Sequence, residues 1–238
     1  ETVLVTARPP RWVDELAHLV GGHGIVICAN GAFWYDVAAG KVIHSDAMAP
    51  EYTIGLANLI RNELPGVLFA AELATGVHFE PNYPELHPAT IPPDAVWAPL
   101  NTVDQPVGKL LARNLEMPET EFLDQVTAIV GDRADVIYSG AGGLAEIGPV
   151  GVSKAGALAL LAAEHGIAAE EVWAFGDMPN DLPMLAWAGT SFAVANAHPD
   201  VLAAATYVCP TNAEDGVAQV LETIRTHSAT ERPDYRRS

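Results

Sequence analysis

Apolar runs of strand length alternate along this chain with longer stretches whose apolar residues recur at helical spacing. This alternation is typical of α/β organisation, in which helices cover a sheet. Near the start, the strand-like runs are TVLVTA and GIVICANGA, and the helical stretch between them is PPRWVDELAHLVGG. In the last third, the strand-like runs are VWAFGD, SFAVANA and YVCP, and the helical stretches are SKAGALALLAAEHG and LPMLAWAG. We therefore predict an α/β fold.

The pattern changes between residues 50 and 147. This part combines a helical stretch, PEYTIGLANLIRNEL, with strand-like runs such as GVLFAAEL and ADVIYSG and a proline-rich passage, EPNYPELHPATIPPDAVWAPL. Mixed secondary structure between two parts in which strand and helix patterns alternate regularly indicates an inserted module. We predict a discontinuous core of residues 1–48 and 148–238, with a separate domain at 49–147.

Composition narrows the classes of protein that fit. The chain has 238 residues, is 50% hydrophobic and carries a formal charge of −18, which disfavours binding to a nucleic-acid backbone. An anionic substrate would need a local positive site or a metal ion. The two cysteines have no metal-binding spacing, so a reducing, cytoplasmic location is expected, and no apolar run reaches the ~18 residues of a membrane span.

Two aspartates follow the run VWAF within five positions of each other: Asp177 and Asp181, with Asn180 between them. In an open parallel sheet, ligands bind at the carboxyl ends of strands. Mg²⁺ takes oxygen ligands and is typically held by one or two carboxylates. This pair therefore suggests a magnesium site, with Asn180 adding a hydrogen bond. Asp181 could also cap the next helix, either as its only role or together with the metal site, but capping alone would leave Asp177 unexplained.

Lys154 begins a predicted helix, after Ser153 as a candidate N-cap. A lysine in the first turn opposes the helix dipole, so its presence suggests an anion at the helix start. The alternative is a solvated lysine on an exposed turn.

Thr6 and Arg8 stand at the end of the first predicted strand, and Asn30 and Gly31 at the end of the second. A hydroxyl and backbone N–H groups near Thr6 could hold a phosphoryl oxygen. Arg8 could instead lie at the surface. Asn30 and Gly31 could contact substrate, or they could form a simple turn.

Six segments together resemble the Cof-like branch of the haloacid dehalogenase superfamily of phosphatases. They cover residues 1–48 and about 144–225, and the middle of the chain matches only in position, where that branch carries a large α/β cap domain of the C2 type. The segments are VTARP, NGA, EIGPVGVSKAGAL, AFGDMPND, AVANAHPDV and EDGVAQVLETI.

The resemblance implies Mg²⁺-dependent phosphoryl transfer through an aspartyl-phosphate intermediate, on a Rossmann-like core with a parallel sheet. Thr6 would bind the phosphoryl group, and Lys154 would neutralise charge on nucleophile and phosphate. Asp177 and Asp181 would bind or support Mg²⁺, with Asn180 between them. Phosphoryl transfer depends mainly on positioning and charge stabilisation, which agrees with these roles.

The first motif of that branch, Asp-x-Asp-Gly-Thr at a strand end, does not occur in these 238 residues. It supplies the nucleophilic aspartate, so the chain as it stands is expected not to run the reaction. We predict an upstream strand and helix of about 30 residues containing Asp-x-Asp.

Three functions are open at this point. The first is a phosphatase of small phosphorylated metabolites, such as sugar phosphates, with the cap excluding water. The second is a phosphomutase or phosphotransferase of the same fold. The third is a non-catalytic protein that binds a phosphorylated ligand. The oligomeric state does not follow from the sequence.

Overall fold

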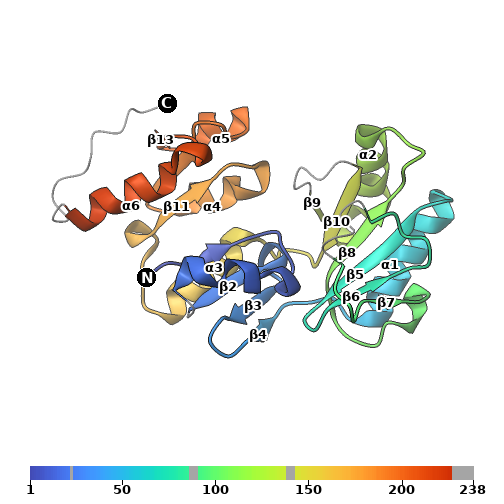
Figure 1. The fold of residues 1–238 in the computed structure, drawn as a ribbon. Coiled ribbons are helices and arrows are strands. Elements are labelled where there is room, and N and C mark those ends of the chain that lie inside the picture. Colours follow the sequence, from blue (N-terminus) through green and yellow to red (C-terminus); the bar gives the residue numbers. More distant parts are fainter. Residues whose placement is uncertain (22–23, 86–90, 138–142, 227–238) are drawn as a thin grey trace. The chain divides into compact units, whose positions relative to one another are not determined.

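The computed structural model describes residues 1–21, 24–85, 91–137 and 143–226. The chain divides into two compact units, Glu1–Ala157 and Leu158–Ser238, and each is described by itself (Figure 1). Both units combine helices with parallel strands, as the alternating pattern predicts. None of the helices in the described ranges is long and apolar enough to cross a membrane.

The first unit begins with a four-stranded sheet in the order β1-β2-β3-β4. β1 and β2 are parallel, whereas β2, β3 and β4 are antiparallel neighbours. The hairpin of β3 and β4 was not predicted, although its strands flank a short glycine-containing turn. The strands are β1 (Leu4–Val5), β2 (Ile25–Cys28), β3 (Phe33–Asp36) and β4 (Lys41–Ser45).

The segment between β1 and β2 is helical, but not as one regular helix. It forms two 3₁₀ helices, η1 (Pro10–Trp12) and η2 (Asp14–Val20). Hydrogen bonds span three residues, from Val13 N–H to Pro10 C=O and from Gly21 N–H to His18 C=O. The tighter turns still bury Val13 and Val20 in the apolar cluster beneath the sheet, so burial rather than helix propensity determines the local geometry.

A second sheet of the first unit has six strands in the order β7-β6-β5-β8-β10-β9. All neighbours are antiparallel except β6 and β7. The strands are β5 (Leu68–Leu73), β6 (Val77–Phe79), β7 (Val96–Trp97), β8 (Val107–Arg113), β9 (Asp135–Ile137) and β10 (Leu144–Gly148). The helices of this part are α1 (Pro50–Glu63), α2 (Glu119–Val130), η5 (Leu100–Thr102) and η6 (Gly131–Arg133). The predicted strand ADVIYSG continues past Ile137 into positions outside the described residues.

The two faces of this six-stranded sheet differ in chemistry. One face shares an apolar core with α1 and α2, which includes Ile60, Phe69, Leu110, Phe122 and Ile147. Because side chains alternate along a strand, the neighbouring residues point to the opposite face. That face carries apolar side chains such as Ala70 and Leu111 together with several buried charged residues.

The strands of residues 68–148 thus pair among themselves, in a sheet separate from β1–β4. A single bridge, from Met48 to Val107, accompanies the passage between the two parts. The compact division of the chain nevertheless falls after Ala157. The boundaries of a core and a cap domain at 48 and 148 therefore stay a prediction.

The second unit contains a parallel three-stranded sheet in the order β11-β12-β13. Its strands are β11 (Trp173–Gly176), β12 (Thr190–Val194) and β13 (Tyr207–Cys209), close to the predicted runs. The accompanying helices are α4 (Leu182–Trp187), α5 (Pro199–Ala204), α6 (Gly216–Thr226), η7 (Ala169–Glu171), η8 (Pro179–Asp181) and η9 (Asn212–Glu214). The helix α3 (Lys154–Glu164) begins in the first unit.

Candidate active site

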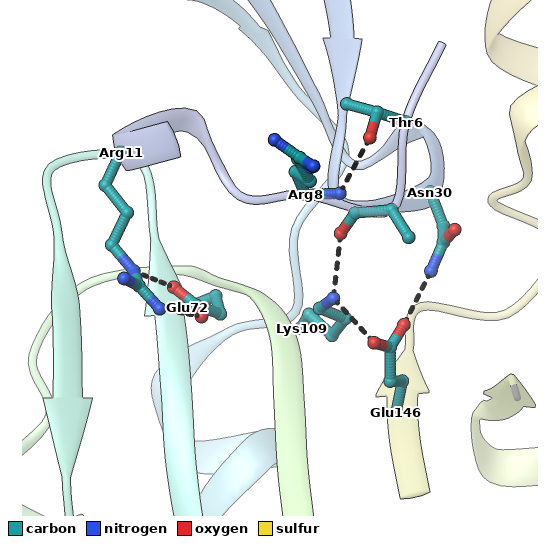
Figure 2. Close-up of polar contacts among 8 residues, drawn as sticks. Thr6, Arg8, Arg11, Asn30, Glu72, Lys109 and Glu146 are labelled. Carbon is teal, nitrogen blue, oxygen red and sulfur yellow. Dashed lines mark hydrogen bonds and ion pairs between the residues drawn. The ribbon is translucent and has the colours of Figure 1, made fainter. Parts of the chain in front are cut away.

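The turn after β1 holds Thr6 and Arg8 (Figure 2). The backbone N–H of Thr6 donates to Ile27 C=O at 2.8 Å, which extends the pairing with β2. The hydroxyl Oγ1 of Thr6 accepts from the backbone N–H of Arg8 at 3.1 Å. This contact fixes the threonine oxygen and leaves its hydrogen able to donate to an anion. Arg8 is exposed, which is compatible with both interpretations of this residue.

A second turn, η3 (Ala29–Gly31), follows β2. All three of its residues have positive φ angles: 49° for Ala29, 59° for Asn30 and 114° for Gly31. The turn is hydrogen-bonded to the first one, with Ala29 N–H donating to Arg8 C=O at 2.9 Å and Asn30 N–H to Thr6 C=O at 3.1 Å. The four predicted residues Thr6, Arg8, Asn30 and Gly31 therefore lie together. Left-handed non-glycine residues often occur at functional sites, because the surrounding structure must hold them.

Gly31 also brings this turn against the start of α3. A Cβ added to Gly31 would lie 2.6 Å from the carbonyl oxygen of Ser153. The hydroxyl of Ser153 accepts from Gly156 N–H at 3.1 Å, which confirms Ser153 as the N-cap. Lys154 follows directly and is only 7% exposed. The interpretation of Lys154 as a solvated lysine on an exposed turn is therefore wrong.

We expect Gly31→Ala to lower the free energy of unfolding by at least about 2 kcal/mol. The left-handed backbone costs an alanine about 1–2 kcal/mol, and the clash with Ser153 adds about 1–3 kcal/mol of overpacking. The matched control is Gly151→Ala, because Gly151 has a φ of 75° and nothing within 4 Å of its added Cβ. Denaturant unfolding measures both; equal losses would contradict the close packing of Gly31.

In the second unit, the loop after β11 is built around Asp181. Its Oδ2 accepts from the backbone N–H groups of Asp177 at 3.0 Å and Met178 at 3.1 Å. The side chain is buried, and Gly176 gives it room, since an added Cβ there would lie 2.7 Å from the Asp181 Cβ. Although Asp181 occupies the N-cap position of α4, its side chain makes no capping hydrogen bond. The capping interpretation is thus wrong, and Asp181 shapes the loop that carries Asp177.

The two carboxylates differ in accessibility. Asp177 is exposed, whereas Asp181 is 4% exposed and uses one oxygen to hold the loop. Asn180 is half-buried in η8 between them. The described residues include no group of three or more histidine, cysteine or acidic side chains arranged for a metal. A pair of carboxylates still fits Mg²⁺, which commonly completes its shell with water and substrate oxygens. In such an arrangement Asp177 would be the direct ligand, and Asp181 would support it.

Neither cysteine is suited to nucleophilic chemistry. Cys28 and Cys209 are both buried and unbridged. Burial raises the pKa of the Cys28 thiol to about 12, so the reactive thiolate is essentially absent at neutral pH.

A set of buried charges next to the turns was not predicted from the sequence. They form two ion pairs, Arg11 with Glu72 at 2.8 Å and Lys109 with Glu146 at 3.1 Å (Figure 2). Glu72, Lys109 and Glu146 come from β5, β8 and β10 of the six-stranded sheet. The available signal was the presence of charged residues within these apolar strands, because charged residues are rarely buried without a partner.

Comparison with known proteins now bears on these residues. Residues 1–221 match the family model of the haloacid dehalogenase-like hydrolases. The chain belongs to this family. The matched range includes both turns, Lys154 and the Asp177–Asp181 loop. The resemblance inferred from the six motifs is therefore confirmed, and with it the α/β fold class and the assignment as a hydrolase.

Relatives of this haloacid dehalogenase-like hydrolase include phosphatases. YxeH, a candidate phosphatase of Bacillus subtilis (strain 168), is 28% identical over 93% of this chain and 84% of its own length. The Escherichia coli (strain K12) 5-amino-6-(5-phospho-D-ribitylamino)uracil phosphatase YbjI is 41% identical over 42% of this chain and 36% of its own length. A haloacid dehalogenase-like hydrolase structure from Bacteroides thetaiotaomicron is 26% identical, with a TM-score of 0.76 over 93% of this chain and 85% of that one. These names agree with a hydrolase of phosphoric monoesters.

Proposed function

We propose that this protein is a Mg²⁺-dependent phosphatase of small phosphorylated metabolites and acts through an aspartyl-phosphate intermediate. The observation that carries the proposal is the pair of hydrogen-bonded turns at Thr6–Arg8 and Ala29–Gly31, with the start of α3 packed against Gly31. A hydroxyl, backbone N–H groups and a buried ammonium are the groups that stabilise a transferring phosphoryl.

Each candidate residue has a proposed role. Thr6 donates its hydroxyl hydrogen to a phosphoryl oxygen, and Lys154 neutralises negative charge on phosphate and nucleophile. Arg8, Asn30 and Gly31 contact the substrate. Lys154 suits its role because it is buried at a helix start, where backbone N–H groups also favour an anion.

The loop after β11 has the proposed role of binding Mg²⁺ through Asp177. Asp181 holds the loop in shape, and Asn180 adds a hydrogen bond. The ion would contribute charge neutralisation on the phosphoryl oxygens. This division of roles rests on the exposed carboxylate of Asp177 and on the two backbone N–H groups that Asp181 accepts.

The nucleophilic aspartate of an Asp-x-Asp motif remains a prediction, because the motif is absent from residues 1–238. β1 and β11 each stand at one end of the strand order in their own sheets. An end strand has backbone groups on one side that can pair with a further strand. The codons upstream of Glu1 and the intact mass of the natural gene product test whether such a strand is encoded.

Sugar phosphates and sugar-alcohol phosphates are the substrate class that we propose. The support is the name of YbjI, whose substrate carries a phosphorylated ribityl chain, and the 41% identity that it shares with part of this chain. The proposed cap, residues 49–147, would determine which of these compounds is accepted.

Release of inorganic phosphate from a panel of aryl, hexose, pentose and pentitol phosphates tests the function in the whole gene product. We expect turnover on at least one sugar or sugar-alcohol phosphate, lost with a chelator and restored by Mg²⁺. Phosphoryl transfer to an added alcohol instead of water would indicate a phosphotransferase. Binding of a phosphorylated ligand without any turnover would contradict the enzyme and favour a binding protein.

A further inference from the structure

Lys109 and Glu146 form a buried ion pair on the face of the six-stranded sheet opposite α1 and α2. Their side chains are each 6% exposed, and Lys109 Nζ lies 3.1 Å from Glu146 Oε1. Each partner also contacts one of the two turns of the candidate site. Lys109 Nζ donates to Ala7 C=O at 2.9 Å, and Glu146 Oε2 accepts from the side-chain Nδ2 of Asn30 at 3.0 Å (Figure 2).

These contacts close a ring. Ala7 lies between Thr6 and Arg8 in the first turn, and Asn30 lies in the second. The backbone N–H of Asn30 donates to Thr6 C=O, so the turns are already joined to each other. The ring runs from the first turn to Lys109, then to Glu146, then to Asn30, and back to the first turn. Movement of either turn would therefore strain a contact of the buried pair.

An ion pair is an unfavourable choice if only stability matters at this position. Desolvation of two buried charges can cancel their attraction, and apolar residues of similar size often stabilise a protein equally well. The hydrogen bonds around both charges instead fix the positions of their partners, because an ammonium group only donates and a carboxylate only accepts. Such a pair is suited to holding particular backbone atoms in place.

The second turn needs to be held. Ala29 and Asn30 have φ angles of 49° and 59°, in the left-handed region that non-glycine residues seldom adopt. Such conformations persist only where surrounding contacts impose them. The hydrogen bond from Asn30 Nδ2 to Glu146 is one of those contacts.

We propose that Lys109 and Glu146 are positioning residues, which hold the turns at Thr6–Arg8 and Ala29–Gly31 in the arrangement that binds the phosphoryl group. The catalytic part of this inference rests on the proposed phosphatase function. The positioning part does not, because it concerns backbone order in the protein without substrate.

A second buried pair in the first unit offers a matched control. Arg11 Nε and a terminal guanidinium nitrogen of Arg11 donate to Glu72 at 3.0 Å and 2.8 Å. This pair also joins the segment after β1 to the six-stranded sheet, and its side chains are 8% and 3% exposed. Arg11 lies in η1, outside both turns. Removal of this pair also takes two buried charges from the protein, and the hydrogen bonds that join Arg11 to Glu72 do not involve Ala7 or Asn30.

The test compares the double variants Lys109→Met/Glu146→Gln and Arg11→Met/Glu72→Gln. Hydrogen exchange of the Arg8, Ala29 and Asn30 backbone N–H groups, measured by NMR, reports the order of the turns. We expect exchange at these three sites to accelerate at least about tenfold in the first variant and to change less than about twofold in the second. Equal acceleration in both variants, or none in the first, would overturn the positioning role.

Steady-state kinetics with an aryl phosphate supply the second measurement. The first double variant is expected to raise KM about tenfold or more, with a smaller change in kcat, and the control is expected to keep both near the natural values. These kinetics use the whole gene product, and its inactivity would contradict the proposed phosphatase, while the exchange measurement would still test the positioning role. Unchanged KM in an active first variant would contradict the link to phosphate binding.

Single variants keep the proposal testable if a double variant does not fold. Glu146→Gln preserves size and one acceptor oxygen, and faster exchange at Asn30 is still expected. Lys109→Arg preserves the charge and a donor, so exchange at Arg8 close to that of the natural protein is expected. If the Arg8 backbone N–H exchanges as fast in Lys109→Arg as in Lys109→Met, packing and not the charged donor orders the turn. That result would overturn the proposal.

Discussion

In the whole gene product, phosphatase turnover is expected to fall by more than about 100-fold in Asp177→Asn, with the fold unchanged. Replacement of one carboxylate oxygen by an NH₂ group removes the negative charge of the proposed Mg²⁺ ligand and keeps the size of the side chain. Two backbone hydrogen bonds of Asp177 do not depend on its side chain. Its N–H donates to Asp181 Oδ2, and its C=O accepts from the N–H of His198. The measurement is kcat on a small phosphomonoester as a function of Mg²⁺ concentration.

Two comparisons sharpen this result. Asp181→Asn removes a supporting carboxylate, so a loss of about 10–100-fold is expected. Asp200→Asn removes an equal charge from an exposed position of the same unit and is expected to keep turnover near the natural value. Natural turnover of Asp177→Asn at the same Mg²⁺ concentration would exclude Asp177 as a metal ligand.

The second large effect is expected from Lys154→Met. In the whole gene product, turnover on an aryl phosphate should decrease by roughly 100-fold or more, because the variant loses the positive charge that is proposed to neutralise the phosphoryl group. Stability should change little, since the apolar stem is retained and a buried positive charge at a helix start is not favoured by the helix dipole. Thermal unfolding and kcat, measured on the same preparation, separate the two effects.

The control for Lys154 is Lys41→Met, at an exposed position of β4. It removes the same charge and should leave turnover and melting temperature near the natural values. If Lys154→Met retains natural turnover, the lysine has a structural role only. If it unfolds, Lys154→Arg keeps the charge, and a folded Lys154→Arg with natural turnover would show that another cation at this position supports turnover.

The sequence predicted the elements whose periodicity is unambiguous. The run VWAFGD became β11, SFAVANA became β12, and the helical stretch after Ser153 became α3. The site residues could be proposed because they stand at strand ends or at a helix start, and because together they resemble the motifs of a known family. The parallel pairing of β1 with β2 places both turns at the same sheet edge. This is why Thr6, Arg8, Asn30 and Gly31 lie close together.

What the sequence could not predict depends on tertiary contacts. The 3₁₀ geometry of residues 10–20 and the β3–β4 hairpin have no strong local signal. The ring contains contacts between Lys109 and Ala7 and between Glu146 and Asn30. The two residues of each contact are more than 100 positions apart in the sequence, so no local pattern predicts the ring. The capping alternative for Asp181 fails for a related reason: both capping and loop closure favour an aspartate at that position, and only its hydrogen bonds in the folded chain distinguish the two roles.

The buried charges of the six-stranded sheet also affect how that sheet can fold. Lys109 and Glu146 each precede an apolar residue of the opposite face, Leu110 and Ile147, which belongs to the core under α1 and α2. Displacement of either strand by one residue would turn each of its side chains to the other face of the sheet. A charged side chain would then lie in that core, and an apolar side chain would lie on the face that now carries the charges. Such an alignment is strongly disfavoured, because a charge buried without its partner is costly. The charged residues therefore select the correct strand alignment as the sheet assembles.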